Sequence, residues 1–384
     1  MDIGGDVAPG FEPVRDAFVA NFARGAELGA AAAIFKDGVK IVDVWGGVAD
    51  KDTGAPWNDD TLQLVFSTTK GATAACAALL MQRGLLDVDA PVAEYWPEFK
   101  AEGKDRIPVR WLLCHRAGLP ALDEPLTPEQ VCAWDPVVDA LAAQKPWWEP
   151  GTKHGYHAFT YGHLVGEVVR RISGKSLGQF FAEEIANPIG AEFFIGLPQS
   201  EEHRVTKLVQ GAPPAGNVAM TDDIKELVAG IMDPTSLISH TFNFAKPALD
   251  LDSPAVHAAE IPAANGICTA RGLARFYASL IGEVDGVRVL DPSTVATVTT
   301  EQSNGKDEVL RKITRFALGF MLDGPDVPYF GSGSFGHDGA GGSLGFADPE
   351  SGIAFGYVMN QMNQGINADP RPHAIIQALK GCLS

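Results

Sequence analysis

The sequence predicts an α+β fold in which an antiparallel sheet is flanked by helices and carries an inserted helical domain. Short apolar runs joined by tight turns gather near both ends of the chain, which favours antiparallel strands over a doubly wound sheet. Helical patterns dominate from Thr61 to about Ala264. We therefore expect residues 1–60 together with 265–384 to form one α/β domain, residues 61–264 to form a mainly helical domain, and the functional site to lie between them.

The N-terminal segment predicts one helix followed by a β-hairpin. Apolar residues recur at helical spacing in Pro13–Glu27. Two short apolar runs follow at Ala31–Phe35 and Val39–Trp45, and Lys36-Asp37-Gly38 separates them. Asp-Gly is a frequent turn pair in hairpins because both residues tolerate positive φ.

The remaining elements are predicted from the same two periodicities. Helical spacing occurs in Thr69–Arg83, Phe159–Ile172, Leu177–Ile185, Thr269–Ile281 and Arg371–Leu379. Strand patterns occur in Arg315–Leu322, Gly333–His337, Ser343–Ala347 and Ile353–Asn360. Long Pro-containing connections are expected at Gly118–Pro128 and Gly211–Gly216.

The composition argues against a nucleic-acid partner and against a disulfide-rich fold. The chain has 384 residues, 46% hydrophobic and 20% charged, so it can bury a large core. Its formal net charge of −18 would repel nucleic acid and favours an enzyme with a neutral or small substrate. The five cysteines are scattered without a Cys-x-x-Cys pair, which argues against a disulfide framework.

The chain shows no targeting or membrane signal. Met1–Pro13 is polar and Gly-rich, without the basic start and apolar run of a signal peptide. No apolar stretch approaches the length of a membrane span. We therefore expect a cytoplasmic protein with no membrane partner, and the sequence leaves homo-oligomerisation open.

Ser67 and Lys70 form a candidate nucleophile and base. Leu64-Val65-Phe66 leads directly into Ser67-Thr68-Thr69-Lys70, and an Ala-rich helix follows. Three residues of separation place both side chains on one helix face. A serine hydroxyl is a poor nucleophile until a base takes its proton, and a lysine can be that base where burial destabilises its ammonium form. Free N–H groups at the helix start could help to hold an oxyanion.

The pattern Ser-x-x-Lys is weak by itself, since Ser303-Asn304-Gly305-Lys306 also fits it. That second copy lies in a polar stretch and is predicted to be a surface loop. Ser67 could equally be an ordinary helix N-cap, with Lys70 in solvent. On this motif alone, the catalytic and the structural interpretation both stay open.

Longer motifs resemble the superfamily of class C serine β-lactamases and penicillin-binding proteins, which includes D-alanyl-D-alanine carboxypeptidases and, closest to this chain, the family VIII carboxylesterases. Leu112–Pro120 resembles the segment "LLxHxSGLP", and Pro150-Gly151-Thr152 with Tyr156 matches "PGTxxxYxN". His337-Asp338-Gly339 falls where the family carries Lys-Thr-Gly. The resemblance covers most of the chain, and it implies the β-lactamase/transpeptidase-like fold, with the active site between the two domains.

The resemblance also implies a role for each matched residue. Ser67 attacks the acyl carbonyl and Lys70 accepts its proton. Tyr156 shares that proton network and protonates the leaving group. The backbone N–H groups of Ser67 and Ala340 form the oxyanion hole.

Further substrate contacts are expected around this centre. His337 would border the leaving-group side, and Gly339 would lie beside it at the end of the strand. Trp148, just before Pro150, could line the acyl or alcohol pocket, or it could simply pack in the core.

Two departures from the family pattern move the expected substrate from a lactam to an ester. Ala158 stands in the third place of "YxN", so an amide that would contact a β-lactam side chain is missing. His337 replaces the lysine of Lys-Thr-Gly, so a fixed cation for a substrate carboxylate is lost. We therefore expect a serine carboxylesterase acting on small acyl esters. A β-lactamase, a D-alanyl-D-alanine carboxypeptidase, a transacylase and a catalytically inactive binding module are the alternatives.

Three other patterns do not fit their context. Gly341–Gly345 matches the nucleophile elbow G-x-S-x-G, but a hairpin follows it rather than a helix, so Ser343 is predicted to be structural. Gly331–Gly336 matches G-x-G-x-x-G without the helix that dinucleotide binding needs. His154, His157 and His163 lack a carboxylate or cysteine at ligand spacing, so neither a metal nor another cofactor is expected.

Overall fold

The computed structural model describes residues 2–211, 222–363 and 368–384. Apart from its first residue, the predicted connection Gly211–Gly216 lies outside the described residues. None of the described helices is long and apolar enough to cross a lipid bilayer.

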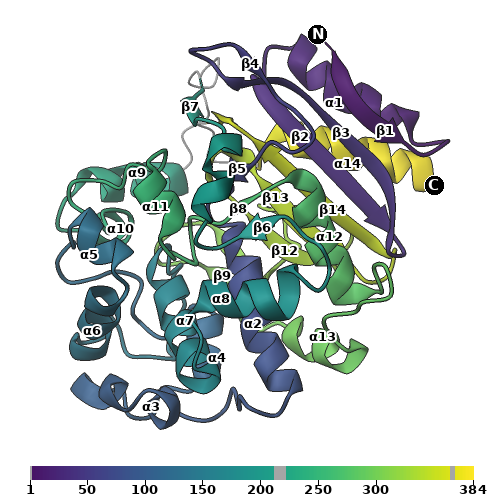
Figure 1. Ribbon diagram of the computed structural model, residues 1–384. Coiled ribbons are helices and arrows are strands. Elements are labelled where there is room, and N and C mark those ends of the chain that lie inside the picture. Colours follow the sequence, from purple (N-terminus) through teal and green to yellow (C-terminus); the bar gives the residue numbers. More distant parts are fainter. Residues whose placement is uncertain (1, 212–221, 364–367) are drawn as a thin grey trace.

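A large antiparallel sheet forms the upper right of the molecule in Figure 1, and it contains strands from both ends of the chain. Its strand order is β1-β3-β2-β14-β13-β12-β11-β10-β9, and the short β4 pairs with β3. The strands are β1 (Ile3–Val7), β2 (Gly29–Lys36), β3 (Val39–Asp50), β4 (Ala55–Pro56), β9 (Ser303–Lys306), β10 (Ile313–Phe316), β11 (Met321–Leu322), β12 (Phe335–Asp338), β13 (Leu344–Asp348) and β14 (Ile353–Met359). The two chain ends meet where β2 pairs with β14.

Helices cover both faces of this sheet. On one face, α1 (Glu12–Ala23) packs against the closing helix α14 (Pro370–Leu383), and both termini lie at this end of the molecule (Figure 1). On the other face, α12 (Ala270–Ile281) contacts β2, β13 and β14. Gly356 on β14 allows this close approach, because a Cβ there would lie 2.4 Å from Ala270 O.

The remaining helices gather beside the sheet around α2 (Thr69–Gln82). Helix α2 contacts α7 (Thr160–Ser173) and α8 (Leu177–Phe181), and its residues belong to the larger of the hydrophobic clusters. The other α-helices of the described residues are α3 (Val92–Tyr95), α4 (Val109–Leu113), α5 (Pro128–Cys132), α6 (Asp135–Ala143), α9 (Asp222–Met232), α10 (Leu237–Phe242), α11 (Pro254–Ala258) and α13 (Pro292–Val298). Short strands β5 (Gln63–Leu64), β6 (Phe193–Phe194) and β8 (Ile267–Cys268) form a separate small sheet, and β7 (Val209–Gln210) pairs with β15 (Gln361–Met362).

The predicted α+β class with its antiparallel sheet is confirmed, and most predicted helices begin and end within a few residues of the observed ones. Two details were wrong. Ser303–Lys306 is strand β9 rather than a surface loop, because it pairs with β10 at the sheet edge. The expected strand Arg315–Leu322 is divided at Gly319, which has φ +91° and makes a tight turn against Ala74 of α2. Strand β1 was not predicted, because its Gly-rich sequence carries no strand pattern.

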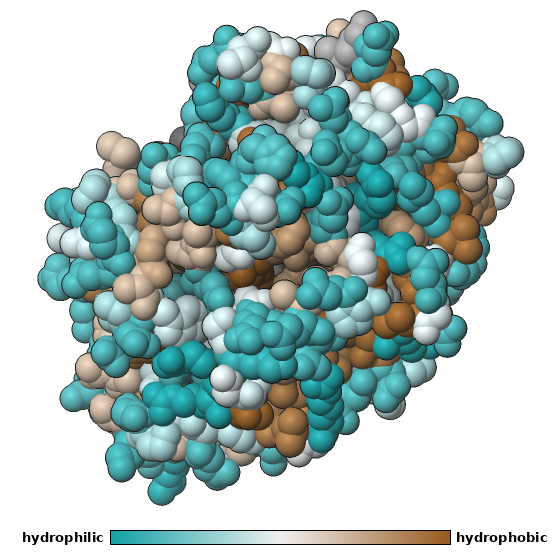
Figure 2. Space-filling view, viewed as in Figure 1, coloured by the Kyte–Doolittle hydropathy of each residue, from teal (hydrophilic) through white to brown (hydrophobic). Residues whose placement is uncertain are grey.

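Every strand of the described large sheet lies within residues 3–56 or 303–359. We therefore propose that residues 1–60 together with 265–384 form one α/β domain and that residues 61–264 form a mainly helical domain. Hydrophilic residues cover most of the face shown in Figure 2.

Candidate active site

Ser67 lies in the short turn that joins β5 to α2. The turn begins where Val65 N–H donates to Gly266 O at 2.9 Å. Phe66, the residue before the serine, has φ +47°, a conformation that a bulky side chain rarely adopts and that concentrates at functional sites. Ser67 itself is only half-buried, and two residues later the buried helix α2 begins. The sequence therefore presents the hydroxyl at the exposed end of an otherwise buried helix.

Lys70 is fully buried in the first turn of α2. Its Nζ donates to Ser67 Oγ at 3.0 Å, to Ala158 O at 2.7 Å and to Ala263 O at 3.0 Å. Burial lowers the pKa of Lys70 well below its usual range, and the charge of Asp338 opposes this shift to a smaller extent. The surroundings therefore favour the neutral amine far more than solvent would.

The two carbonyl groups determine the orientation of a neutral Lys70. A neutral amine has two N–H groups and one lone pair, whereas a backbone carbonyl can only accept hydrogen bonds. Ala158 O and Ala263 O therefore take the two N–H groups. The lone pair is left facing Ser67 Oγ, which is the geometry required of a general base.

Tyr156 is also in contact with this pair. The centroid of its ring lies 4.7 Å from Lys70 Nζ, and Tyr156 lines the same cavity as Ser67. Burial raises the pKa of Tyr156 well above its usual range, while the neighbouring Ser67 side chain acts in the opposite direction. The phenol therefore stays protonated and is able to give a proton to a departing group.

Asp307 fixes the backbone at Tyr156 and was not identified from the sequence. Its fully buried Oδ1 accepts from the N–H groups of Tyr156 at 3.0 Å, Val309 at 2.8 Å and Leu310 at 2.9 Å. Its Oδ2 accepts from Thr314 Oγ1 at 3.2 Å. No local pattern could have revealed this role, because Asp307 and Tyr156 are 151 residues apart.

Ala340 opens the turn after β12 and lies at the same site as Ser67, since both residues line one cavity. Among the described residues, neither backbone N–H donates to a protein acceptor. Gly339 brings this turn close to the nucleophile, because a Cβ there would lie 2.3 Å from Val65 O and 2.1 Å from Ser343 Oγ. The two N–H groups are thus free to hold an oxyanion in the cavity.

The cavity has a volume of about 240 Å³ and brings together the residues Ser67, Tyr156, Gly339 and Ala340. Its apolar lining includes Phe242, Leu310, Met321, Val327, Leu344 and Ile376. Its charged lining consists of Asp326, Asp338, Asp369 and Lys312, together with His373.

Two predicted substrate contacts lie outside this lining. His337 is buried, its ring centroid lies 5.9 Å from that of Tyr156, and the cavity wall at this position is Asp338 instead. Burial lowers the pKa of His337 to about 4, so its ring is neutral at ordinary pH. Trp148 is half-buried and packs edge-on against His157 at 6.1 Å.

The structure also places Ser343 and Ser303, the two serines whose motifs were not expected to be catalytic. Ser343 is buried, donates to Val65 O at 2.8 Å and lies 3.1 Å from Thr68 Oγ1, so its hydroxyl is occupied by the segment around the nucleophile. Ser303 is buried and donates to Cys114 O at 2.8 Å. Within the described residues, no group of His, Cys, Asp and Glu side chains has the arrangement of a metal site.

A buried lysine facing a serine at a helix start, on this α+β fold, defines a serine hydrolase of the penicillin-recognising type. The sequence profile of the family described as Beta-lactamase matches residues 14–380. The chain therefore belongs to the β-lactamase family.

Individual relatives agree with this assignment. Esterase/beta-lactamase LipL of Mycobacterium tuberculosis (strain ATCC 25618 / H37Rv) is 37% identical over 365 residues, which are 93% of this chain and 83% of LipL. A family VIII carboxylesterase of known crystal structure is 40% identical, with a TM-score of 0.87 and 100% of both chains covered. A penicillin-binding-protein homolog from Caulobacter crescentus is 36% identical, with a TM-score of 0.88 and the same coverage. The predicted family, fold and enzyme class are thus confirmed.

Proposed function

We propose that this protein is a serine carboxylesterase that hydrolyses small acyl esters through an acyl-enzyme at Ser67. The observation that carries the proposal is the environment of Lys70, whose buried Nζ lies 3.0 Å from Ser67 Oγ. LipL and the family VIII carboxylesterase support the esterase assignment, since both are described as acting on esters and are at least 37% identical to this chain.

In the proposed acylation step, Lys70 removes the proton of Ser67 as Oγ attacks the ester carbonyl. The negative charge that develops on the carbonyl oxygen is held by the N–H groups of Ser67 and Ala340. As the tetrahedral intermediate collapses, the C–O bond to the alcohol breaks, and Tyr156 transfers a proton to the departing oxygen. The proton held by Lys70 returns to Tyr156, and the acyl group remains on Ser67.

Deacylation reverses these roles. A water molecule gives its proton to the Lys70–Tyr156 pair while its oxygen attacks the acyl carbonyl. The same two N–H groups hold the second tetrahedral intermediate. Ser67 Oγ then leaves with a proton, and the carboxylic acid product is released.

The charges around the cavity favour an uncharged acyl ester. Asp326 and Asp338 line the described cavity with one lysine, Lys312, while the charge of a third lining carboxylate, Asp369, is balanced by Arg371. A penicillin or a peptidoglycan stem carries a carboxylate, which this excess of negative charge would repel. A neutral ester does not incur this repulsion.

The alternative is a β-lactamase, which the description of LipL also names. A purified preparation that opens a cephalosporin faster than it hydrolyses p-nitrophenyl butyrate would favour that alternative. Transfer of the acyl group to an added alcohol would identify a transacylase instead.

The test of the proposal is intact-protein mass spectrometry after brief exposure to p-nitrophenyl butyrate. We expect one butyryl group on the native chain and none on Ser67→Ala, with loss of turnover in the variant. The matched control is Ser303→Ala, taken from the second Ser-x-x-Lys copy, which should acylate normally. Absence of acylation in the native chain, or labelling that persists in Ser67→Ala, would overturn the proposal.

A further inference from the structure

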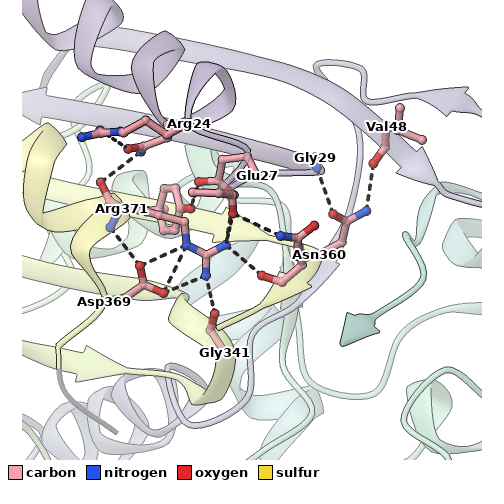
Figure 3. A network of polar contacts seen from close by, with 12 residues as sticks. Arg24, Glu27, Gly29, Val48, Gly341, Asn360, Asp369 and Arg371 are labelled. Carbon is pink, nitrogen blue, oxygen red and sulfur yellow. Dashed lines mark hydrogen bonds and ion pairs between the residues drawn. The ribbon is translucent and has the colours of Figure 1, made fainter. Parts of the chain in front are cut away.

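A buried network of charges lies behind the turn that carries Ala340 (Figure 3). Arg371, in the first turn of α14, is only 4% exposed. Its Nη1 donates to Glu27 Oε2 at 3.1 Å, and its Nη2 donates to Asp369 Oδ2 at 2.7 Å. Glu27 also accepts a hydrogen bond from the hydroxyl of Tyr357 on β14. The guanidinium group is therefore fixed between two carboxylates that come from opposite ends of the chain.

The same guanidinium group holds three backbone segments. Its Nη1 donates to Gln361 O at 2.8 Å and to Ala26 O at 3.3 Å. Its Nη2 donates to Gly341 O at 2.6 Å, and Figure 3 shows this bond reaching the turn from α14. Arginine suits this position because its five N–H groups lie in one rigid plane and can serve several acceptors together.

The bond from Arg371 holds Gly341, which is the residue directly after Ala340. Gly341 has φ +83° and Gly342 has φ +126°, so the turn has a backbone form that only glycine adopts freely. A Cβ on Gly342 would lie 2.5 Å from Arg371 Nη2 and 2.3 Å from Asp369 Oδ2. The turn therefore rests directly on the Arg371–Asp369 pair, and a shift of that pair would displace it.

We infer that Arg371 is a positioning residue for the oxyanion hole: through Gly341 O it fixes the turn from which Ala340 directs its N–H into the cavity. The inference rests on the proposed function, in which that N–H stabilises the tetrahedral intermediate. Arg371 itself does not line the cavity, so it acts on the reaction through the backbone and not by touching the substrate.

The decisive variant is Arg371→Lys, which keeps the positive charge between Glu27 and Asp369. A lysine offers donors from a single atom and cannot serve both carboxylates and Gly341 O together. Removal of one oxyanion donor lowers kcat by about 100-fold or more, and a misplaced one should cost about 10- to 100-fold. We expect such a fall in kcat per titrated active site, with KM for p-nitrophenyl butyrate changed by less than about threefold because ground-state binding is spared.

A second readout separates positioning from a general loss of stability. An alkylboronic acid bonds to Ser67 Oγ as a tetrahedral anion, so its inhibition constant should rise with the loss of kcat. The matched control is Asn21→Ala, which removes the bond from Asn21 Nδ2 to Arg371 O at 3.1 Å but leaves the guanidinium contacts in place. It should lower the melting temperature and leave kcat and boronate affinity unchanged.

Native kcat and boronate affinity in folded Arg371→Lys would overturn the inference, as would equal changes in Asn21→Ala. If Arg371→Lys does not fold, Asp369→Asn decides the question. Its amide would face the guanidinium donors and loosen the pair, so kcat should fall several-fold at constant KM, and an unchanged kcat would overturn the inference. Failure of the native chain to acylate would instead refute the proposed function.

Discussion

At the scale of single residues, the environment of Lys70 decides the chemistry of the site. A solvated lysine is protonated at neutral pH and cannot act as a base. Here burial disfavours the ammonium form, and the carbonyls of Ala158 and Ala263 orient the amine toward Ser67. Ala158 thus contributes its backbone at the position where the family pattern has an asparagine side chain.

Replacement of Lys70 by methionine should remove the base while keeping an unbranched chain of similar length. General-base catalysis typically contributes 10²- to 10⁴-fold, so we expect kcat/KM to fall by about 1,000-fold. If neutral Lys70 is the base, activity should fall as the pH drops through the lowered pKa of this group. A pH–rate profile with p-nitrophenyl butyrate tests both statements.

The matched control for this substitution is Lys306→Met, from the second Ser-x-x-Lys copy. Lys306 is paired with Asp223 and Glu226 at the surface and does not line the cavity. Exposed ion pairs contribute little to stability, so we expect its loss to leave kcat/KM within about twofold of native. Activity above a tenth of native in Lys70→Met would contradict the assigned base.

At the scale of elements, helix α2 and the turn after β12 fix the relative position of the two halves of the site, which are Ser67 and Ala340. Every residue of α2 from Thr69 to Leu80 is buried, and Gly71 leaves room for the Tyr277 hydroxyl, which would lie 2.2 Å from an added Cβ. The helix therefore cannot shift without disturbing the core. Ser343, at the end of the turn after β12, ties that turn to the nucleophile segment through Val65 O.

Ser343→Ala should weaken this link without removing the nucleophile. Loss of one buried hydrogen bond costs about 1–3 kcal/mol, so we expect a fall of this size in the free energy of unfolding. Acylation of Ser67 should still go to completion. Denaturant titration and intact-protein mass spectrometry measure the two quantities. Loss of acylation in a folded variant would revive Ser343 as the candidate nucleophile.

At the scale of the whole molecule, the sheet joins the two chain ends, and the network around Arg371 fastens that junction to the active site. Glu27 precedes β2, Tyr357 lies on β14 and Arg371 lies in the first turn of α14, so three segments share one buried set of charges. Burial raises the pKa of Glu27 from 4.5 to about 7, with Arg371 opposing the shift. The stability of the fold therefore depends on the pH at which this carboxyl ionises.

The sign of this dependence follows from proton linkage. The folded state binds the Glu27 proton more tightly than the unfolded state does, so the contribution of Glu27 to stability is fully present below pH 4.5 and is lost as the pH rises through about 7. The shift corresponds to about 3 kcal/mol as an order of magnitude. Glu27→Gln should remove this part of the change in the free energy of unfolding with pH. Urea titrations of the native chain and the variant at pH 5 and pH 8.5 would detect the difference. Equal slopes in the two proteins would contradict the raised pKa.

The sequence by itself determined the class of fold, the family and the residue types of the candidate centre. Strand and helix periodicity is local, so the antiparallel sheet and the helical middle could be predicted from short segments. Ser67, Lys70 and Tyr156 could be identified because each lies in a motif whose spacing is fixed along the chain.

Only the tertiary structure decided how those groups are held. The acceptors of Lys70, the support of Tyr156 by Asp307 and the anchoring of the Ala340 turn by Arg371 all join segments far apart in sequence. Such contacts depend on how the elements pack, and no local periodicity encodes them. For the same reason, the structure placed His337 outside the cavity lining and Asp338 within it, because the local direction of β12 decides which side chain faces the cavity.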